Sequence, residues 1–186
     1  MAKTFDCIAA LAANNGIGIK GEMPWRLPKE TKYFTQMSKT SQCEGKQNAV
    51  IMGRKSWDAI PSKFRPLSDR LNVVISRSLT QSPHEGVLLA NSLSNALHLV
   101  TSPPYGDQID RLWVMGGQPI FEEALKSPLC RRLYLTRIMK DYECDCFFPD
   151  FDESAYKLIS EETQEEIEKK SQEKVSYKLC VYEKII

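Results

Sequence analysis

Apolar positions in this chain form short runs that are separated by segments with helical spacing. Four of the runs are almost continuously apolar, which is typical of strands that are buried on both faces of a sheet. They span residues 5–11, 49–52, 71–75 and 112–115. Because these runs alternate along the chain with helical segments, the pattern predicts an α/β fold with a mainly parallel central sheet of about eight strands.

Four other segments have either the apolar spacing of a helix or a proline at a position where helices begin or end. In segment 93–100, apolar residues recur at the i, i+3, i+4 and i+7 positions of an amphipathic helix. A proline suited to the first turn predicts helices at 28–39 and 119–126, and Pro61 ends a shorter helix at 54–60. We therefore expect about four helices to flank the sheet.

The C-terminal segment has a different pattern. From residue 175 to residue 182 apolar and polar positions alternate with a period of two, which predicts a half-buried antiparallel strand. Residues 156–159 are its expected partner. The segment between them, 160–174, is rich in Glu and Lys and fits either an acidic interaction element or a solvated connection; its mixed signs favour the connection. Since no linker or repeat interrupts the chain, we expect a single domain, 1–186.

Charge and composition restrict the function. Among 186 residues, 25 Lys and Arg stand against 24 Asp and Glu, for a net charge of +1. Nucleic acid is therefore not expected as the main partner, and an anionic ligand must be held by local charges. No apolar run approaches the roughly 20 residues of a membrane span. Six cysteines without a Cys-x-x-Cys pair predict free thiols in the cytoplasm, and with two histidines we expect no metal site.

The glycines at 16, 18 and 21 form a G-x-G-x-x-G pattern after the first predicted strand. A dinucleotide-binding fingerprint of this form must continue directly into a helix, and an acidic residue must follow the second strand. Here Pro24 and Pro28 prevent that helix, and the second predicted strand ends without an acid. We therefore interpret the segment as a loop that carries Met23 and Trp25 at a ligand-binding edge of the sheet.

Glu30 lies at a helical position that points inward. It shares the i, i+3, i+4 and i+7 stripe with Tyr33, Phe34 and Met37. Burial on this stripe would raise the pKa of the carboxyl group. Alternatively, Glu30 occupies the first turn only because a carboxylate there interacts well with the helix dipole. The periodicity and the nearby Trp25 favour a functional site.

Three turns after predicted strands are suited to anions. They are 53–56 and 116–119, which contain glycines, and 76–78, which contains Arg77. Each one alone is compatible with ordinary turn chemistry. Because the carboxyl ends of parallel strands meet at one edge, the three turns together favour an extended ligand with separated phosphates.

Several motifs along the chain occur in a specific order and spacing. They are 8–10, 16–18, 23–28, Glu30, 33–34, 50–57, 60–61, 65–67, 74–77, 116–117 and 147–149. Together they resemble dihydrofolate reductases of the eukaryotic type, over residues 5–183. The resemblance implies reduction of dihydrofolate by NADPH, binding of antifolates such as methotrexate, and a monomer without an obligate protein partner.

The resemblance also implies roles around the substrate. Glu30 would hydrogen-bond the pterin and favour protonation at N5 through water guided by Trp25, and Met23 would complete the catalytic group. Thr136 would steady the Glu30 carboxylate, and Arg70 would clamp the carboxylate of the glutamate tail. The other substrate-binding residues would be Ile8, Ala9, Thr31, Phe34, Ile60, Leu67 and Met115.

The cofactor implied by the resemblance is NADPH. Cations at two strand ends, Arg54 and Arg77, would surround its 2′-phosphate, whereas an NAD site places an acid near the ribose. The cofactor-binding residues would be Ala10, Ile17, Gly18, Gly21, Glu22, Gly53, Arg54, Lys55, Ser56, Ser76, Arg77, Ser78, Gly116, Gly117, Gln118, Pro119, Ile120 and Phe121.

Three positions depart from the family's pattern, namely Thr31, Asn91 and Phe121. Thr31 stands where vertebrate members carry an aromatic residue, so antifolate preference cannot be transferred. Two alternatives remain open: a reductase of the pyrimidine deaminase-reductase type, against which Glu30 and Trp25 argue, and a noncatalytic nucleotide-binding module.

Overall fold

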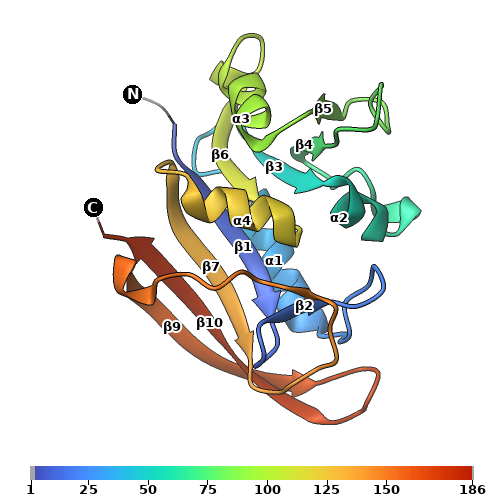
Figure 1. The fold of residues 1–186 in the computed structure, drawn as a ribbon, viewed down its shortest axis with the longest axis vertical. Coiled ribbons are helices and arrows are strands. Elements are labelled where there is room, and N and C mark those ends of the chain that lie inside the picture. The colour runs from blue at the N-terminus through green and yellow to red at the C-terminus, as the bar shows by residue number, and fades with distance from the viewer. Residues whose placement is uncertain (1–2, 186) are drawn as a thin grey trace.

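The structure is a computed structural model that describes residues 3–185. Its centre is an eight-stranded sheet with the strand order β5-β4-β3-β6-β1-β7-β10-β9 (Figure 1). The strands of this sheet are β1 (Phe5–Leu11), β3 (Gln47–Gly53), β4 (Arg70–Ile75), β5 (Leu88–Ala90), β6 (Ile109–Val114), β7 (Cys130–Ile138), β9 (Tyr156–Ile167) and β10 (Lys174–Lys184). Two short strands, β2 (Gly16–Gly18) and β8 (Cys146–Phe147), pair separately.

The strand directions confirm the predicted fold class. The pairs from β5 across to β7 are all parallel, whereas β10 is antiparallel to both β7 and β9. The carboxyl ends of β1, β3, β4 and β6 therefore lie at one edge of the sheet. All the turns that the sequence suggests for ligand binding follow these four strands, so the topology collects them at that edge.

The four predicted helices are confirmed. They are α1 (Pro28–Lys39), α2 (Arg54–Ala59), α3 (Leu93–Thr101) and α4 (Gln118–Lys126), and three short 3₁₀ turns span Ser62–Phe64, Gly106–Gln108 and Glu153–Ala155. Helices α1 and α4 cover opposite faces of the sheet (Figure 1). Apolar residues of α3 and α4 pack in one cluster with β1 and β3, and those of α1 and α2 pack in a second cluster. Alternate residues of the buried strands supply both clusters.

The predicted connection at 160–174 is wrong for its first part, because residues 160–167 belong to β9 and only residues 168–173 connect β9 to β10. Strand β9 continues to Ile167 because β10 offers a backbone ladder along its whole length. The charged residues of β9 mostly face solvent, but Glu166 and the following Glu168 are only 8% and 1% exposed. Both carboxylates accept backbone N–H groups, which offsets the cost of burying them. Because the segment is rich in Glu, its composition did not indicate that these two residues are buried.

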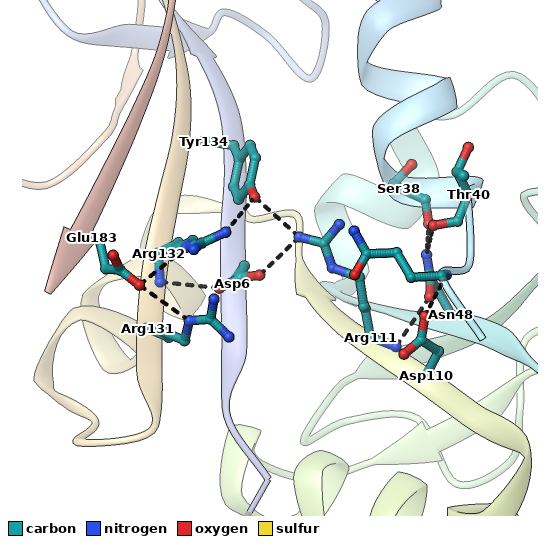
Figure 2. A network of polar contacts seen from close by, with 11 residues as sticks. Asp6, Ser38, Thr40, Asn48, Asp110, Arg111, Arg131, Arg132, Tyr134 and Glu183 are labelled. Carbon is teal, nitrogen blue, oxygen red and sulfur yellow. Dashed lines mark hydrogen bonds and ion pairs between the residues drawn. The ribbon is translucent and has the colours of Figure 1, made fainter. Parts of the chain in front are cut away.

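The carboxyl end of α1 is tied to the sheet by the buried side chain of Asn48 (Figure 2). Its Nδ2 donates to the carbonyl oxygens of Ser38 and Thr40, at 3.0 Å each, and its Oδ1 accepts from the backbone N–H of Arg111 at 3.0 Å. The Arg111 guanidinium in turn donates to Asp6 on β1 at 3.2 Å. Helix α1 is therefore fixed to β3, β6 and β1 at this end.

No helix within residues 3–185 is long and apolar enough to cross a membrane. All six cysteines are free thiols, as predicted.

Candidate functional site

Glu30 is the central ionisable group of the candidate site. It lies in the first turn of α1, is 4% exposed, and its Oε1 accepts a hydrogen bond from Thr136 Oγ1 at 2.9 Å. Burial raises the pKa of Glu30 to about 7; the bond from Thr136 opposes this rise and the nearby charge of Glu166 adds to it. Both protonation states are thus populated near neutral pH, as a proton donor requires.

Trp25 precedes α1 and is buried at 2% exposure. Its ring packs on Tyr142 with the centroids 5.3 Å apart, and it lies in an apolar cluster with Leu27 and Tyr177. Among the described residues, no acceptor faces the buried Trp25 Nε1–H. A buried donor of this kind is suited to a water molecule or a polar ligand atom.

Most of the predicted substrate wall comes together on the α1 side of the sheet. One apolar cluster contains Ile8 of β1, Phe34 of α1 and Met115, which follows β6, together with Ile60 and Leu67. These five residues come from four separate parts of the chain, so only the fold could bring them together.

Two other predicted substrate residues, Ala9 and Thr31, and the predicted catalytic residue Met23 do not join this cluster. Ala9 packs in the cluster on the opposite face of the sheet, because successive residues of β1 alternate between its faces. Thr31 is exposed on α1, and Met23 is 48% exposed in the loop before it. Thr31 and Met23 are therefore accessible to a ligand but are not packed against the wall, whereas Ala9 is buried on the other face.

Arg70 begins β4 and is a buried cation, only 8% exposed. Its Nη1 donates to Ser38 Oγ at 2.8 Å and its Nε to the Ser68 carbonyl oxygen at 2.9 Å. Burial lowers the pKa of Arg70, which nevertheless stays charged as arginine does in proteins. Since neutral acceptors hold it in place, the guanidinium is oriented and suited to a carboxylate ligand.

The glycine turns after β3 and β6 lie against each other. The Gly53 N–H donates to the Gly116 carbonyl at 2.8 Å. Gly116 has a φ of +115°, and a Cβ there would lie 3.1 Å from the Phe121 ring; a Cβ on Gly117 would lie 3.3 Å from Ser56 Oγ. Glycine is thus needed for this close backbone approach. The close glycine backbone and the Ser56 hydroxyl beside it fit a phosphate-bearing cofactor.

Cations surround these turns. Arg54 Nη1 donates to Ser78 Oγ at 3.4 Å, and Arg54 Nε lies 3.6 Å from Asp58. Ser76 Oγ lies 3.3 Å from Ser78 Oγ. Lys55 and Arg77 are exposed, and within residues 3–185 neither pairs with a carboxylate. The positive charges of Lys55 and Arg77 are therefore available to phosphate groups.

The loop after β1 contains a short strand and a turn instead of a helix. In β2, Gly18 pairs with Cys146 of β8, and a turn with Gly21 at a φ of +78° joins Ile19 to Glu22. This arrangement confirms that the glycine pattern is not a dinucleotide-binding fingerprint. Ile17 is half-buried and Ala10 lies beside the Trp25 cluster.

The residues at the start of α4 differ in exposure. Gln118 Oε1 accepts from the Phe147 N–H at 3.0 Å, and Pro119 is exposed. Ile120 and Phe121 are buried, at 8% and 2% exposure, and Phe121 packs on Phe148. These two side chains pack against Gly53 and Gly116. They would therefore act on a cofactor through the glycine turns and not by touching it.

Sequence reasoning missed several residues that hold the site together, namely Ser38, Asn48, Glu166, Glu168 and Tyr177. Their patterns are those of ordinary surface or strand residues. One weak signal was available, because Glu166 and Tyr177 fall on the same face once β9 and β10 are paired in register. The sequence alone does not give the register in which β9 pairs with β10.

Comparisons with known proteins give one family. The family model described as dihydrofolate reductase matches residues 4–184. Dihydrofolate reductase of Sus scrofa is 46% identical over 183 residues, with 98% of both chains covered, and that of Mus musculus is 45% identical over 185 residues, with 99% of both covered. The solved structure of Schistosoma mansoni dihydrofolate reductase matches with a TM-score of 0.85 and 30% identity over 100% of both chains. The chain therefore belongs to the dihydrofolate reductase family and reduces dihydrofolate to tetrahydrofolate with NADPH.

Proposed function

We propose that Glu30 supplies the proton needed at N5 when this enzyme reduces dihydrofolate. NADPH, when bound, supplies a hydride from C4 of its nicotinamide to C6 of the pterin. The observation that carries this proposal is a buried carboxyl group with a pKa of about 7, oriented by Thr136. In its neutral form Glu30 can donate a proton, directly or through a water molecule bonded to the Trp25 Nε1–H.

The other roles follow from the same arrangement. The apolar cluster of Ile8, Phe34, Ile60, Leu67 and Met115 would pack on the pterin and exclude water, which strengthens polar interactions near Glu30. Arg70 would bind the carboxylate of the glutamate tail with its remaining N–H groups. Met23, Ala9 and Thr31 would contact the substrate from positions outside the cluster.

On the cofactor side, the turns at 53–56 and 116–119 would hold the pyrophosphate. Arg54, Ser76 and Arg77 would bind the 2′-phosphate, which supports a preference for NADPH over NADH. Within residues 3–185 the exposed cations Lys55 and Arg77 have no carboxylate partner, which supports the roles of Lys55 at the pyrophosphate and of Arg77 at the 2′-phosphate.

We further infer that the chain acts as one domain, as a monomer, and in the cytoplasm. The eight-stranded sheet, which includes both β1 and β10, supports the first inference, and the free thiols support a reducing compartment. Size-exclusion chromatography with light scattering tests the monomer, because a mass of twice 21.2 kDa would contradict it.

The replacement Glu30→Gln tests the main proposal. Because the amide cannot donate the proton that the neutral acid donates, the hydride-transfer rate at pH 7.5 should fall by about 100-fold or more. Part of the rate should return in acid, where the substrate arrives already protonated. In the unmodified enzyme the neutral form of Glu30 is lost as pH rises through about 7, so its rate should fall on the alkaline side. Single-turnover rates across the pH range measure both effects.

The exposed residue Glu162 provides the matched control. Glu162→Gln should leave the pH profile unchanged. If Glu30→Gln retained both the rate and the pH profile of the unmodified enzyme, Glu30 would not be the proton source.

A further inference from the structure

The amino end of α1 is capped by a carboxylate from a distant part of the chain. The N-cap residue, Leu27, makes no side-chain hydrogen bond to the helix. Instead the Lys29 N–H donates to Glu166 Oε1 at 3.0 Å, and the Glu30 N–H donates to Glu166 Oε2 at 3.1 Å. These are two of the N–H groups that a helix leaves without partners in its first turn. Glu166 of β9 thus holds the backbone of Glu30 itself.

Glu166 is in turn held by the tail hairpin. Tyr177 of β10 donates its hydroxyl to Glu166 Oε2 at 2.7 Å. Both oxygens of Glu166 act as acceptors, as those of an ionised carboxylate do. With 8% exposure, the Glu166 side chain has little freedom to leave this position.

The register of the sheet explains why these groups meet. Tyr177 is opposite both Gln164 of β9 and Ile138 of β7. Because opposite residues face the same way and side chains alternate along a strand, Glu166, Tyr177 and Thr136 lie on one face of the sheet. Thr136 holds the Glu30 carboxylate on that face. Three adjacent strands therefore fix Glu30 at its backbone and at its side chain.

Each element packed against Glu30 presents one polar side chain to it. Strand β7 presents the neutral Thr136, β10 presents the neutral Tyr177, β9 presents Glu166, and α1 itself carries Tyr33 one turn later. Burial raises the pKa of Tyr177 and Tyr33, so neither phenol ionises near neutral pH. Glu166 is the carboxylate in this group, and its negative charge disfavours a second negative charge on Glu30.

We propose that Glu166 is a positioning residue for the reaction: it anchors the Glu30 backbone on the tail hairpin and places a second carboxylate beside the proton donor. The proposal rests on the role proposed above for Glu30. A neighbouring residue, Glu168, offers a control within the same hairpin. Its Oε2 accepts from the Arg26 N–H at 3.0 Å, so it anchors the loop before α1 without acting on the charge of Glu30.

The test compares Glu166→Gln, Glu166→Asp and Glu168→Gln in the full chain, with saturating NADPH and dihydrofolate. Removing the charge in Glu166→Gln should lower the midpoint of the alkaline decline in the single-turnover rate by about half to one pH unit. At pH 8 the rate should then fall by about threefold to tenfold, because less of Glu30 is protonated. Glu166→Asp keeps the charge and should keep the midpoint, and Glu168→Gln should keep it as well.

A folded Glu166→Gln protein with an unchanged midpoint would overturn the proposal, and so would an equal shift in Glu168→Gln. If Glu166→Gln does not fold, the single-turnover rate of Glu166→Asp tests the proposal instead. Its shorter side chain withdraws from the Lys29 and Glu30 N–H groups, so its rate should fall at every pH with the midpoint retained, and an unchanged rate would contradict the proposal. Glu30→Gln separates the two hypotheses. If the alkaline decline in the single-turnover rate disappears in Glu30→Gln while Glu166→Gln keeps the midpoint of the unmodified enzyme, only the role of Glu166 is contradicted.

Discussion

The proposed substrate side and the proposed cofactor edge of this enzyme differ in how their charged side chains are held. On the substrate side Glu30 and Arg70 are buried, and each is hydrogen-bonded to a protein side chain, Thr136 or Ser38. At the cofactor edge Lys55 and Arg77 are exposed and have no carboxylate partner within residues 3–185. A buried charge is costly without partners, so it is fixed before the ligand binds, whereas an exposed cation is solvated and can be ordered by the ligand.

This difference predicts that changes on the substrate side have larger and more specific effects than changes at the cofactor edge. The largest is expected for Arg70→Lys. Lysine cannot keep the bonds to Ser38 and Ser68 while binding a carboxylate with two parallel N–H groups. The KM for dihydrofolate should rise by about 100-fold, since breaking one partner of a buried charged pair costs 2–5 kcal/mol. Steady-state kinetics with dihydrofolate measure this rise.

A dihydropteridine substrate without the glutamate tail is the control for Arg70→Lys. Its KM should change little, because it offers no carboxylate to the guanidinium. Equal losses for the two substrates would mean that Arg70 supports the fold and not the tail.

An intermediate effect is expected for Arg77→Ala at the cofactor edge. Loss of one exposed charge-assisted bond should raise the Kd for NADPH by about tenfold and leave that for NADH nearly unchanged. Because salt screens exposed charges, the difference between variant and unmodified enzyme should shrink in 0.5 M salt, a concentration at which the Debye length is only about 4 Å. Fluorescence titration with both cofactors measures these constants. Equal losses for NADPH and NADH would remove the 2′-phosphate assignment.

The smallest effect is expected for Ser38→Ala. This change removes the Oγ that accepts from Arg70 Nη1 but leaves the guanidinium and the Ser68 carbonyl in place. One hydrogen bond contributes about 1 kcal/mol, so the KM for dihydrofolate should rise by about fivefold with kcat unchanged. Ser68→Ala is the matched control, since Arg70 uses only the backbone carbonyl of Ser68. A change in kcat without a change in KM would show that Ser38 does not act through Arg70.

The helices, the parallel strands and Glu30 could be predicted from the sequence, but the contacts that hold Glu30 could not. Buried parallel strands and amphipathic helices follow local rules, and all four helices and the parallel sheet were predicted from them. Glu30 could be recognised because its position on the apolar stripe of α1 is a local property. The Glu166 cap could not be recognised, since the N–H groups of Lys29 and Glu30 lie 137 and 136 residues away in the chain and its own segment has the composition of a solvated connection.

By itself, the sequence determined the four helices, the buried strands β1, β3, β4 and β6, the glycine and cationic turns, and the inward position of Glu30, because each depends on residues within a few positions of one another. Only the tertiary structure decided which groups hold these residues. Pairing of β9 with β10 places Glu166 under the first turn of α1, and Asn48 and Ser38 join the other end of that helix to the sheet and to Arg70. Contacts of this kind depend on strand order and register, which arise from burying the whole chain together and not from any local pattern.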